Sequence, residues 1–81
     1  LAGWKDGDSW RYYYGNRALV GWWDIGSDSD MERYYFDENA VMVSSKWIQI
    51  DSKWYYFYKD GTLAKSTTVD GYEVDENGVR K

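Results

Sequence analysis

The chain has 81 residues, of which 43% are hydrophobic and 21% aromatic, and its net charge is −4. It contains neither Cys nor His, so disulfides and thiolate or imidazole metal sites cannot stabilise its fold. The negative charge argues against duplex nucleic acid as a partner. No apolar run approaches the ~18 residues that a membrane-spanning helix needs.

Aromatic clusters recur along the chain about 20 residues apart, which indicates a repeat protein. The clusters are Tyr12-Tyr13-Tyr14, Tyr34-Tyr35-Phe36, Tyr55-Tyr56-Phe57 and a weaker Tyr72-Glu73-Val74. We divide the chain into repeats 3–20, 21–44, 45–66 and 67–81 and expect residues 1–81 to be a single module from a longer protein. Stacked repeats also bury surface that so small a domain could not bury otherwise.

The first two repeats, 3–20 and 21–44, each predict a β-hairpin followed by a second turn. In the first, Asp6-Gly7-Asp8 joins the strands and Gly15-Asn16 makes the second turn. In the second, residues 26–30 lengthen the hairpin loop. Asn39-Ala40 stands where the third repeat has Asp60-Gly61, so we expect Asn39 to adopt the left-handed conformation there.

The third repeat, 45–66, is the clearest hairpin. Trp47 opens one alternating run, Asp51-Ser52 interrupts it, and Trp54-Tyr55-Tyr56-Phe57 makes the second run. The fourth repeat, 67–81, is short, with turns at Asp70-Gly71 and Asn77-Gly78, and we interpret it as a terminal cap. No segment shows a sustained period of 3.6, so no helix is predicted and the expected fold class is all-β.

Strand alternation predicts two faces. The side chains that are apolar or aromatic in every repeat should form the packed interior: Tyr12/Tyr14, Tyr34/Phe36, Tyr55/Phe57 and Tyr72/Val74. The alternate positions vary in polarity and should face grooves or solvent: Arg11/Tyr13, Arg33/Tyr35, Trp54/Tyr56 and Gly71/Glu73. A ligand would be met on the second face.

The pattern G-W-x(n)-W-Y-Y-F-x-x-x-G-x-L/M resembles the choline-binding, or cell-wall-binding, repeat of Gram-positive surface proteins and phage lysins, with related repeats in glucan-binding domains. The resemblance implies stacked β-hairpin repeats, a β-solenoid of about three hairpins plus a short terminal cap. It also implies a ligand site between successive repeats. The site is built from the opening Trp, the Trp of the W-Y-Y triplet and the second residue of the next repeat's aromatic cluster, normally a Tyr. A quaternary ammonium donates no hydrogen bond, so aromatic faces are its best partners, at ~0.5–2 kcal/mol each.

Carried onto this sequence, the resemblance implies three trios, none of them a complete aromatic site. Between the first two repeats the trio is Trp4, Arg11 and Tyr35, with Trp10 displaced by one position. The next two trios are Trp22, Arg33 and Tyr56, and then Trp47, Trp54 and Glu73. An Arg repels a cation whereas a Glu attracts one, so the last trio suits choline best and the first two suit a sugar. The expected ligand-binding residues are therefore Trp47, Trp54, Glu73, Trp22, Tyr56, Trp4 and Tyr35.

The Trp residues have a second interpretation, as anchors packed between hairpins. Trp23 is extra to the pattern and either covers the long loop or presents an aromatic face to carbohydrate. The acidic run between Asp24 and Glu38 is interpreted as a solvated loop. It fails as an EF-hand, because counting from Asp28 places Arg33 and Asn39 at the sixth and twelfth positions.

Catalysis has little support, since there is no His, no Cys and no G-x-S-x-G nucleophile elbow. We expect a non-catalytic module, without cofactor or metal, that anchors a larger secreted protein at the cell wall. Its partners would be choline or cell-wall glycan or teichoic acid, beside an attached catalytic or effector domain. The competing hypothesis is a structural spacer or protein-docking module that has lost ligand binding.

Overall fold

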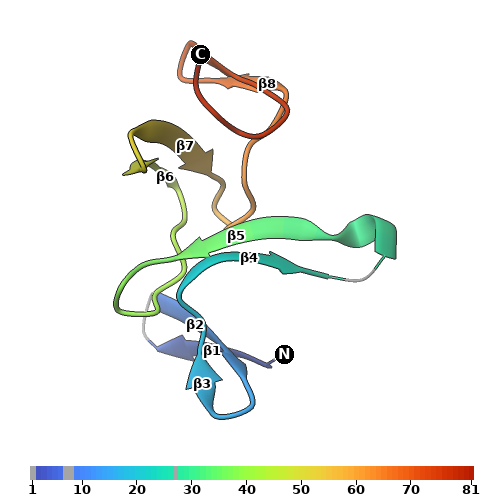
Figure 1. Cartoon of the computed structure of the whole chain (residues 1–81), viewed down its shortest axis with the longest axis vertical. Helices are drawn as coiled ribbons and strands as arrows, with labels where there is room; N and C mark the ends of the chain where they lie inside the picture. The colour runs from blue at the N-terminus through green and yellow to red at the C-terminus, as the bar shows by residue number, and fades with distance from the viewer. Residues whose placement is uncertain (1, 7–8, 27) are drawn as a thin grey trace. The chain divides into compact units, whose positions relative to one another are not determined.

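The computed structural model describes residues 2–6, 9–26 and 28–81, and within these ranges it leaves out the side chains of Ala2, Trp4, Lys5, Asp6 and Asp28. The chain divides into two compact units, Leu1–Val43 and Ser44–Lys81. We call them the N-terminal unit and the C-terminal unit and describe each by itself. Both are built from antiparallel hairpins (Figure 1).

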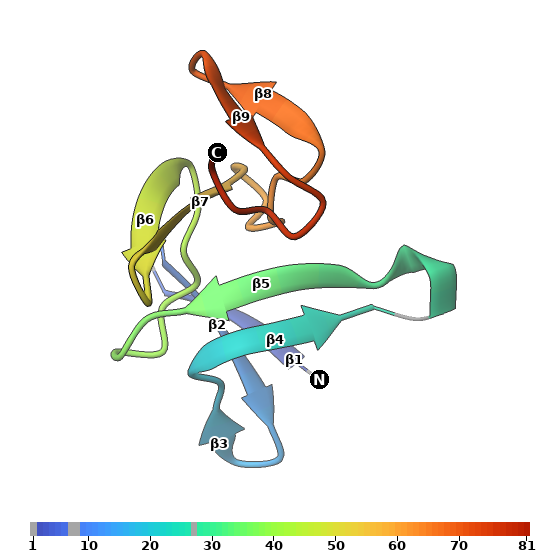
Figure 2. The ribbon, with the colours of Figure 1, turned by 45° about the horizontal axis from the view of Figure 1, so that its top comes forward.

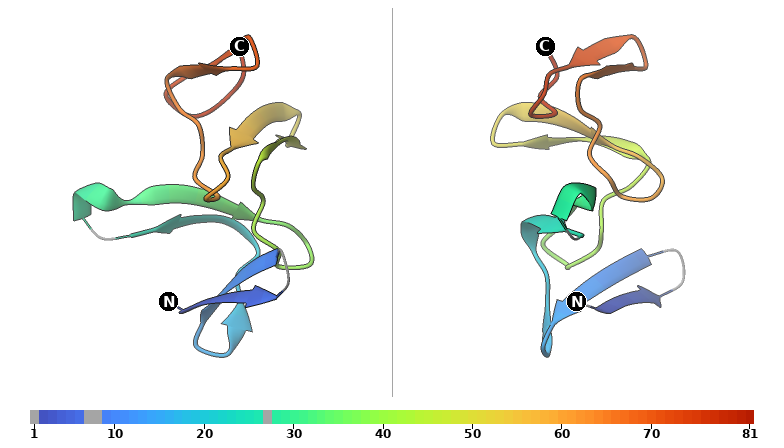
Figure 3. Two further views of the ribbon diagram at one scale, coloured as in Figure 1. Left: turned by 180° about the vertical axis from the view of Figure 1, so that it is seen from behind. Right: turned by 90° about the vertical axis from the view of Figure 1, so that its right-hand side faces the viewer.

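The N-terminal unit holds two sheets. Strands β1 (Ala2–Asp6), β2 (Ser9–Tyr14) and β3 (Arg17–Ala18) form the first, in the order β1-β2-β3. Strands β4 (Gly21–Ile25) and β5 (Glu32–Phe36) form the second. The loop between β4 and β5 contains one short 3-10 turn, Asp28–Asp30, at the far end of the hairpin (Figure 3, left).

The C-terminal unit holds two hairpins (Figure 2). Strand β6 (Lys46–Ile50) pairs with β7 (Lys53–Phe57), and β8 (Thr67–Val69) pairs with β9 (Tyr72–Val74). Each connection has two residues with positive φ: 50° and 70° at Asp51-Ser52, and 52° and 81° at Asp70-Gly71. Two positive φ angles match the right-handed twist of the flanking strands, which makes this the preferred geometry for a two-residue hairpin.

A tight loop after the second strand of three hairpins returns the chain to that strand through an isolated bridge. The bridges are Phe36↔Met42, Phe57↔Leu63 and Val74↔Arg80. Left-handed backbone occurs at the same place in each loop, with φ of 64° at Ala40, 89° at Gly61 and 86° at Gly78. The prediction that Asn39 carries this conformation is wrong. Asn39 instead donates its backbone N–H to Asp37 Oδ1 at 2.9 Å, and the left-handed residue comes next.

The core consists mainly of the last residues of three aromatic clusters and of apolar residues in the loops that follow the clusters. Phe36 and Phe57 are fully buried, and the other buried hydrophobic residues are Leu19, Ala40, Met42, Val43, Ile50, Leu63, Ala64 and Val74. In the N-terminal unit, Tyr12, Ile25 and Tyr34 pack against a cluster of Leu19, Phe36 and Met42. The predicted interior is therefore confirmed for Phe36, Phe57 and Val74.

The predicted interior is wrong for Tyr14 and Tyr72, which are 70% and 49% exposed. In the first repeat Tyr13 pairs with Ala18, as Phe36 pairs with Met42, so the inward position falls one residue earlier than predicted. Tyr14 then lies beside the turn at Gly15, where it is exposed. Tyr72 follows the Asp70-Gly71 turn and begins its strand.

The predicted fold class is confirmed: the described residues form an all-β protein of repeated hairpins. The last hairpin is short, as the cap interpretation predicts, with strands of three residues each. Of the predicted turns, Gly15-Asn16 connects β2 and β3. Gly7 and Asp8, from the turn predicted at Asp6-Gly7-Asp8, lie outside the described residues.

Candidate functional site

The hairpin β6–β7 gathers three aromatic side chains on one face. Trp47 on β6 lies opposite Tyr56 on β7, and Trp54 is two residues before Tyr56 on the same strand. Because alternate residues of a strand share a face, Trp54 and Tyr56 point to the side on which Trp47 lies. The rings of Trp47 and Tyr56 meet edge to face, with centroids 5.3 Å apart and planes inclined at 62°.

The next hairpin, β8–β9, adds the ring of Tyr72 and also holds the indole of Trp47 in place. The ring of Tyr72 lies 5.8 Å from that of Trp47 and nearly perpendicular to it, at 82°. Trp47 Nε1 donates a hydrogen bond of 3.0 Å to Asp70 Oδ2 in the β8–β9 turn. This bond crosses between consecutive hairpins and sets the orientation of the indole.

Arg80, in the segment after β9, completes the site. The backbone N–H of Arg80 donates to the carbonyl oxygen of Trp54 at 2.9 Å. The Arg80 side chain then reaches over the rings: its Cζ lies 4.4 Å from the ring centroid of Tyr72, 5.4 Å from that of Trp54 and 5.5 Å from that of Trp47. All three distances are within the ~6 Å over which an aromatic face attracts a cation.

We call Trp47, Trp54 and Tyr72 the cage. Its chemistry is that of a cation site made of aromatic faces, because the negative face of each ring quadrupole points to a positive charge. Trp54 is 36% exposed and Tyr72 is 49% exposed, so the cage is open to solvent on one side. Sequence reasoning brought together Trp47 and Trp54 but missed both Tyr72 and Arg80.

The structure does not bring Glu73, the third member of the predicted trio, to the cage. Its carboxylate Oε2 lies 3.5 Å from Lys81 Nζ, and both side chains are exposed. Glu73 pairs with Thr68, whereas its neighbour Tyr72 starts β9 and contacts Trp47. A role for Glu73 in ligand binding stays a prediction.

Equivalent backbone hydrogen bonds align the first repeat with the third. Leu19 N–H donates to the Tyr12 carbonyl as Ala64 N–H donates to that of Tyr56. Tyr12 thus corresponds to Tyr56, and Trp10, two residues earlier, corresponds to Trp54. Met42 N–H accordingly donates to the Trp10 carbonyl at 2.8 Å. The structural counterpart of Trp54 is therefore Trp10 and not Arg11. In the trio expected from Trp4, Arg11 and Tyr35, the middle position thus lies one residue earlier in the chain.

The position that corresponds to Trp47 is Gly3, which faces Tyr12 across the sheet. A Cβ at Gly3 would lie 3.1 Å from the Tyr12 ring, so that ring occupies the space beside the glycine. Tyr12 in turn lies 6.4 Å from the ring of Trp10 and 6.3 Å from that of Tyr34. The side chain of Trp4, a predicted ligand residue, lies outside the described residues.

In β4–β5, Trp22 and Tyr35 lie opposite each other, with ring centroids 5.1 Å apart. Arg33 occupies the strand position of Trp54, and its Cζ lies 5.7 Å from the Trp22 ring centroid. Arg33 also pairs with Asp24, with Nε–Oδ1 at 2.9 Å and Nη2–Oδ2 at 3.4 Å. Tyr56, the third member of the trio predicted with Trp22 and Arg33, belongs to the other compact unit, so that trio stays a prediction.

Trp23, which the pattern does not require, donates its Nε1–H to the Val20 carbonyl at 3.1 Å and is exposed. Its indole is thus tied to the segment before β4. No group of three or more acidic side chains among the described residues could hold a metal ion. Within those ranges, no helix is long and apolar enough to cross a membrane.

Two aspartates order the loops next to the cage, and their hydrogen bonds lower their pKa values. The Thr62 hydroxyl donates to Asp60 Oδ1 at 2.7 Å and the Thr62 N–H at 3.0 Å, which lowers the pKa of Asp60 below its ordinary 3.8. The N–H groups of Val79 and Asn77 donate to Asp75 Oδ1 and lower the pKa of Asp75 in the same way. The Asp75 loop leads directly to Arg80, so this carboxylate orders the backbone that precedes Arg80.

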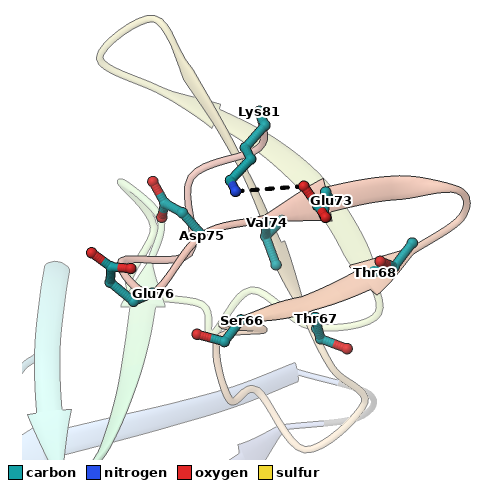
Figure 4. A pocket seen from close by; sticks show the side chains of 8 residues that line it. All are labelled: Ser66, Thr67, Thr68, Glu73, Val74, Asp75, Glu76 and Lys81. Atoms are coloured by element: carbon teal, nitrogen blue, oxygen red, sulfur yellow. Dashed lines mark ion pairs between the residues drawn. The ribbon is translucent and has the colours of Figure 1, made fainter.

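A separate hollow of about 330 Å³ lies on the terminal hairpin (Figure 4). Its lining contains hydroxyl and charged groups but no aromatic ring: Ser66, Thr67, Thr68, Glu73, Val74, Asp75, Glu76 and Lys81. The Lys81–Glu73 ion pair spans part of it (Figure 4). Its chemistry differs from that of the cage, and it is not a second cation cage.

Comparisons with known proteins point to one family. Residues 41–79 match the choline-binding repeat. The choline binding domain of Spr1274 from Streptococcus pneumoniae is 30% identical, with a TM-score of 0.87 over 98% of this chain and 92% of that one. Choline binding protein F from the same organism is 36% identical, with a TM-score of 0.86 over 98% and 26% of the two chains.

The modular Cpl-1 endolysin complexed with a peptidoglycan analogue is 26% identical, with a TM-score of 0.81 over 99% of this chain and 24% of that one. The chain thus spans nearly the whole of the Spr1274 domain but only about a quarter of the other two proteins. A comparison with curated proteins gives no match.

Proposed function

The chain belongs to the choline-binding repeat family, and from this premise we propose that it is a non-catalytic module that binds choline-bearing cell-wall polymer at the cage. The observation that carries the proposal is the convergence of Trp47, Trp54 and Tyr72 on one positive group. A quaternary ammonium carries a positive charge and no N–H, so such faces are its natural partners. Each face contributes ~0.5–2 kcal/mol.

The parent protein, in this proposal, is a longer secreted protein of the cell surface that the module anchors to the wall. Choline binding protein F and the Cpl-1 endolysin support this, since the chain corresponds to about a quarter of each. Residues 1–81 would then be one repeat module next to a catalytic or effector domain. Weak binding at each cage becomes tighter binding when several cages engage one polymer.

The competing hypothesis is a structural spacer that has lost ligand binding. The specific observation that favours it is that arginine guanidinium groups already lie over Trp22 and Trp47. A spacer needs no accessible ring, whereas the exposure of Trp54 and Tyr72 leaves the cage partly open. The two hypotheses therefore differ in whether an external cation reaches these faces.

The test is titration of intrinsic Trp fluorescence with choline, beside its neutral isostere 3,3-dimethyl-1-butanol, and then with α-glucan and peptidoglycan fragments. The Trp54→Ala variant removes one face and should weaken choline binding by about 2- to 30-fold, while the neutral isostere should bind poorly to either form. Trp23→Ala is the matched control, because it removes an exposed Trp outside the cage.

Choline affinity that is equal in the chain and in Trp54→Ala would remove the cage from the proposal. If no ligand at millimolar concentration changes the Trp emission of the chain or of an Arg80→Ala variant, the spacer hypothesis replaces the binding proposal. A response to glycan without one to choline would keep the wall-binding function and change its ligand.

A further inference from the structure

We infer that Arg80 is an internal occupant of the cage, and that its guanidinium competes with any external cation for the faces of Trp47, Trp54 and Tyr72. The inference rests on the proposed function and adds a residue that controls affinity at the same site. Its starting point is geometric: three ring centroids from two hairpins lie 4.4–5.5 Å from the Cζ of a single side chain.

The partners of Arg80 separate it from other cations of the chain. Arg33 has Asp24 and Lys81 has Glu73, so each pairs with a carboxylate. Among the residues that the structure describes, no carboxylate lies within ion-pair distance of the Arg80 guanidinium. The aromatic faces are therefore its main attraction, and these are the groups that a quaternary ammonium would use.

The repeat pattern shows that a cation is unusual at this position. Arg80 forms the isolated bridge with Val74, as Met42 does with Phe36 and Leu63 with Phe57. Met42 and Leu63 are buried, at 7% and 3% exposure. The first two bridge positions are thus occupied by buried apolar residues. Of the three, only Arg80 has a charged group, and this group reaches the rings.

Occupation of the cage by Arg80 excludes a second cation from the same faces. At 4.4 Å from the Tyr72 centroid the guanidinium is in contact with that ring, which leaves no room for a trimethylammonium group beside it. The backbone hydrogen bond from Arg80 to Trp54 does not involve the side chain, so the side chain can leave while the hairpins stay joined. Binding of an external cation is then reduced by the fraction of time that Arg80 spends in the cage.

The experiment compares choline binding by the chain and by Arg80→Ala in calorimetry and in Trp fluorescence. Removal of the internal cation should tighten choline binding by at least about fivefold, because the faces no longer have to be vacated. Lys65→Ala is the matched control, since it removes one exposed positive charge from the same unit. It should leave the affinity within about twofold, because exposed charges at a distance are largely screened.

A second measurement follows Arg80 itself. In the unliganded chain, NMR should show ring-current shifts of the Arg80 Nε–Hε group, and saturating choline should return the resonance toward its position in an unstructured peptide. Arg80→Leu guards against misfolding of the alanine variant, because Leu63 shows that leucine fits the corresponding position. It should bind choline more tightly than the chain does as well.

The outcomes separate the inference from the function on which it rests. Equal choline affinity in the chain, Arg80→Ala and Arg80→Leu would overturn the inference and leave the proposed function intact. Absence of choline binding in all three folded forms would overturn both. Tighter binding in both variants, together with the shift of the Arg80 resonance on titration of the chain, supports both.

Discussion

The hairpins β4–β5 and β6–β7 carry a tryptophan at the same strand position, and each indole has an arginine over it. Arg33 lies 5.7 Å from Trp22, and Arg80 lies 5.5 Å from Trp47. Arg33 comes from the strand paired with that of Trp22 and stands opposite Asp24, which holds it through a short ion pair. Arg80 comes from the loop after β9, and three rings lie around its guanidinium.

The difference shows what turns an aromatic face into a binding site. In β4–β5 the guanidinium has a carboxylate partner in its own hairpin as well as the ring contact. Where rings from two hairpins surround the charge, the faces themselves supply the recognition. The β6–β7 and β8–β9 pair thus has the chemistry of a cation receptor, whereas β4–β5 combines a ring contact with an ion pair.

The largest expected effect tests whether the two regions depend on each other. Phe36→Ala and Phe57→Ala each empty a fully buried site and should cost about 3–5 kcal/mol of stability. Phe57→Ala should abolish the ring-current shift of Arg80 and leave that of Arg33, and Phe36→Ala should do the reverse. Denaturant unfolding followed by Trp fluorescence and by the two arginine resonances measures this. Loss of both signals in either variant would show that the units unfold as one.

The next effect concerns the matched left-handed positions Ala40 and Gly78. A Cβ at Gly78 would lie 2.7 Å from Leu63 Cδ2, and its φ is 86°. Gly78→Ala should therefore cost about 1–3 kcal/mol and loosen the Arg80 loop. Ala40→Gly relieves left-handed strain in the other unit and should stabilise it by up to about 1 kcal/mol. Thermal unfolding measures whether each substitution raises or lowers stability. A Gly78→Ala variant as stable as the original chain would contradict the close packing.

Double-mutant cycles sharpen the comparison of the two arginines. The coupling free energy of Trp54 with Arg80 should be ~0.5–2 kcal/mol and should change little with salt, because it comes from ring contacts. The cycle of Trp22 with Arg33 should give a smaller value, since Asp24 continues to hold Arg33 in the Trp22→Ala variant. In 0.5 M NaCl the Asp24–Arg33 pair, with both side chains about half exposed, should weaken further. Similar salt dependence of the two cycles would contradict this distinction.

The smallest expected effect is a pH dependence of the C-terminal unit. The folded-state pKa values of Asp60 and Asp75 are below 3.8, the ordinary value that we assign to the unfolded chain. The stabilisation is therefore fully present above pH 3.8 and is lost as the pH falls through the folded-state values. Thermal unfolding across this window should show a smaller acid response in Asp60→Asn and Asp75→Asn. An unchanged response in the double variant would assign it to other carboxylates.

Much of the fold follows from local sequence signals. The Asp70-Gly71 dipeptide and the alternating runs on either side of Asp51-Ser52 predict hairpins that the structure contains. The recurrence of aromatic doublets predicts the repeats, because each hairpin needs a neighbour to bury one face. Intrinsic preference favours Asn39 for left-handed backbone, whereas the loop position equivalent to Gly61 and Gly78 is that of Ala40.

The candidate site was predicted less well, since it depends on register between hairpins. Trp47 and Trp54 belong to one hairpin, and their shared face could be derived from alternation. Tyr72 and Glu73 are adjacent, and only the pairing in β8–β9 decides which of them reaches Trp47. A signal for Arg80 was present, because G-V-R in the last repeat stands where the third has G-T-L. Arg80 is thus a positively charged residue at a position that is apolar in the second and third repeats, at Met42 and Leu63.

The hydrogen bond from the Arg80 backbone to Trp54 joins the second strand of one copy to the closing bridge of the next. The binding unit is therefore offset from the unit of sequence: two of the three cage residues are encoded in one repeat and the third in its successor. Insertion or deletion of one copy of about 20 residues changes the number of junctions between repeats by one. The residue at the bridge position of the incoming copy then decides whether that junction is open to a ligand or already filled.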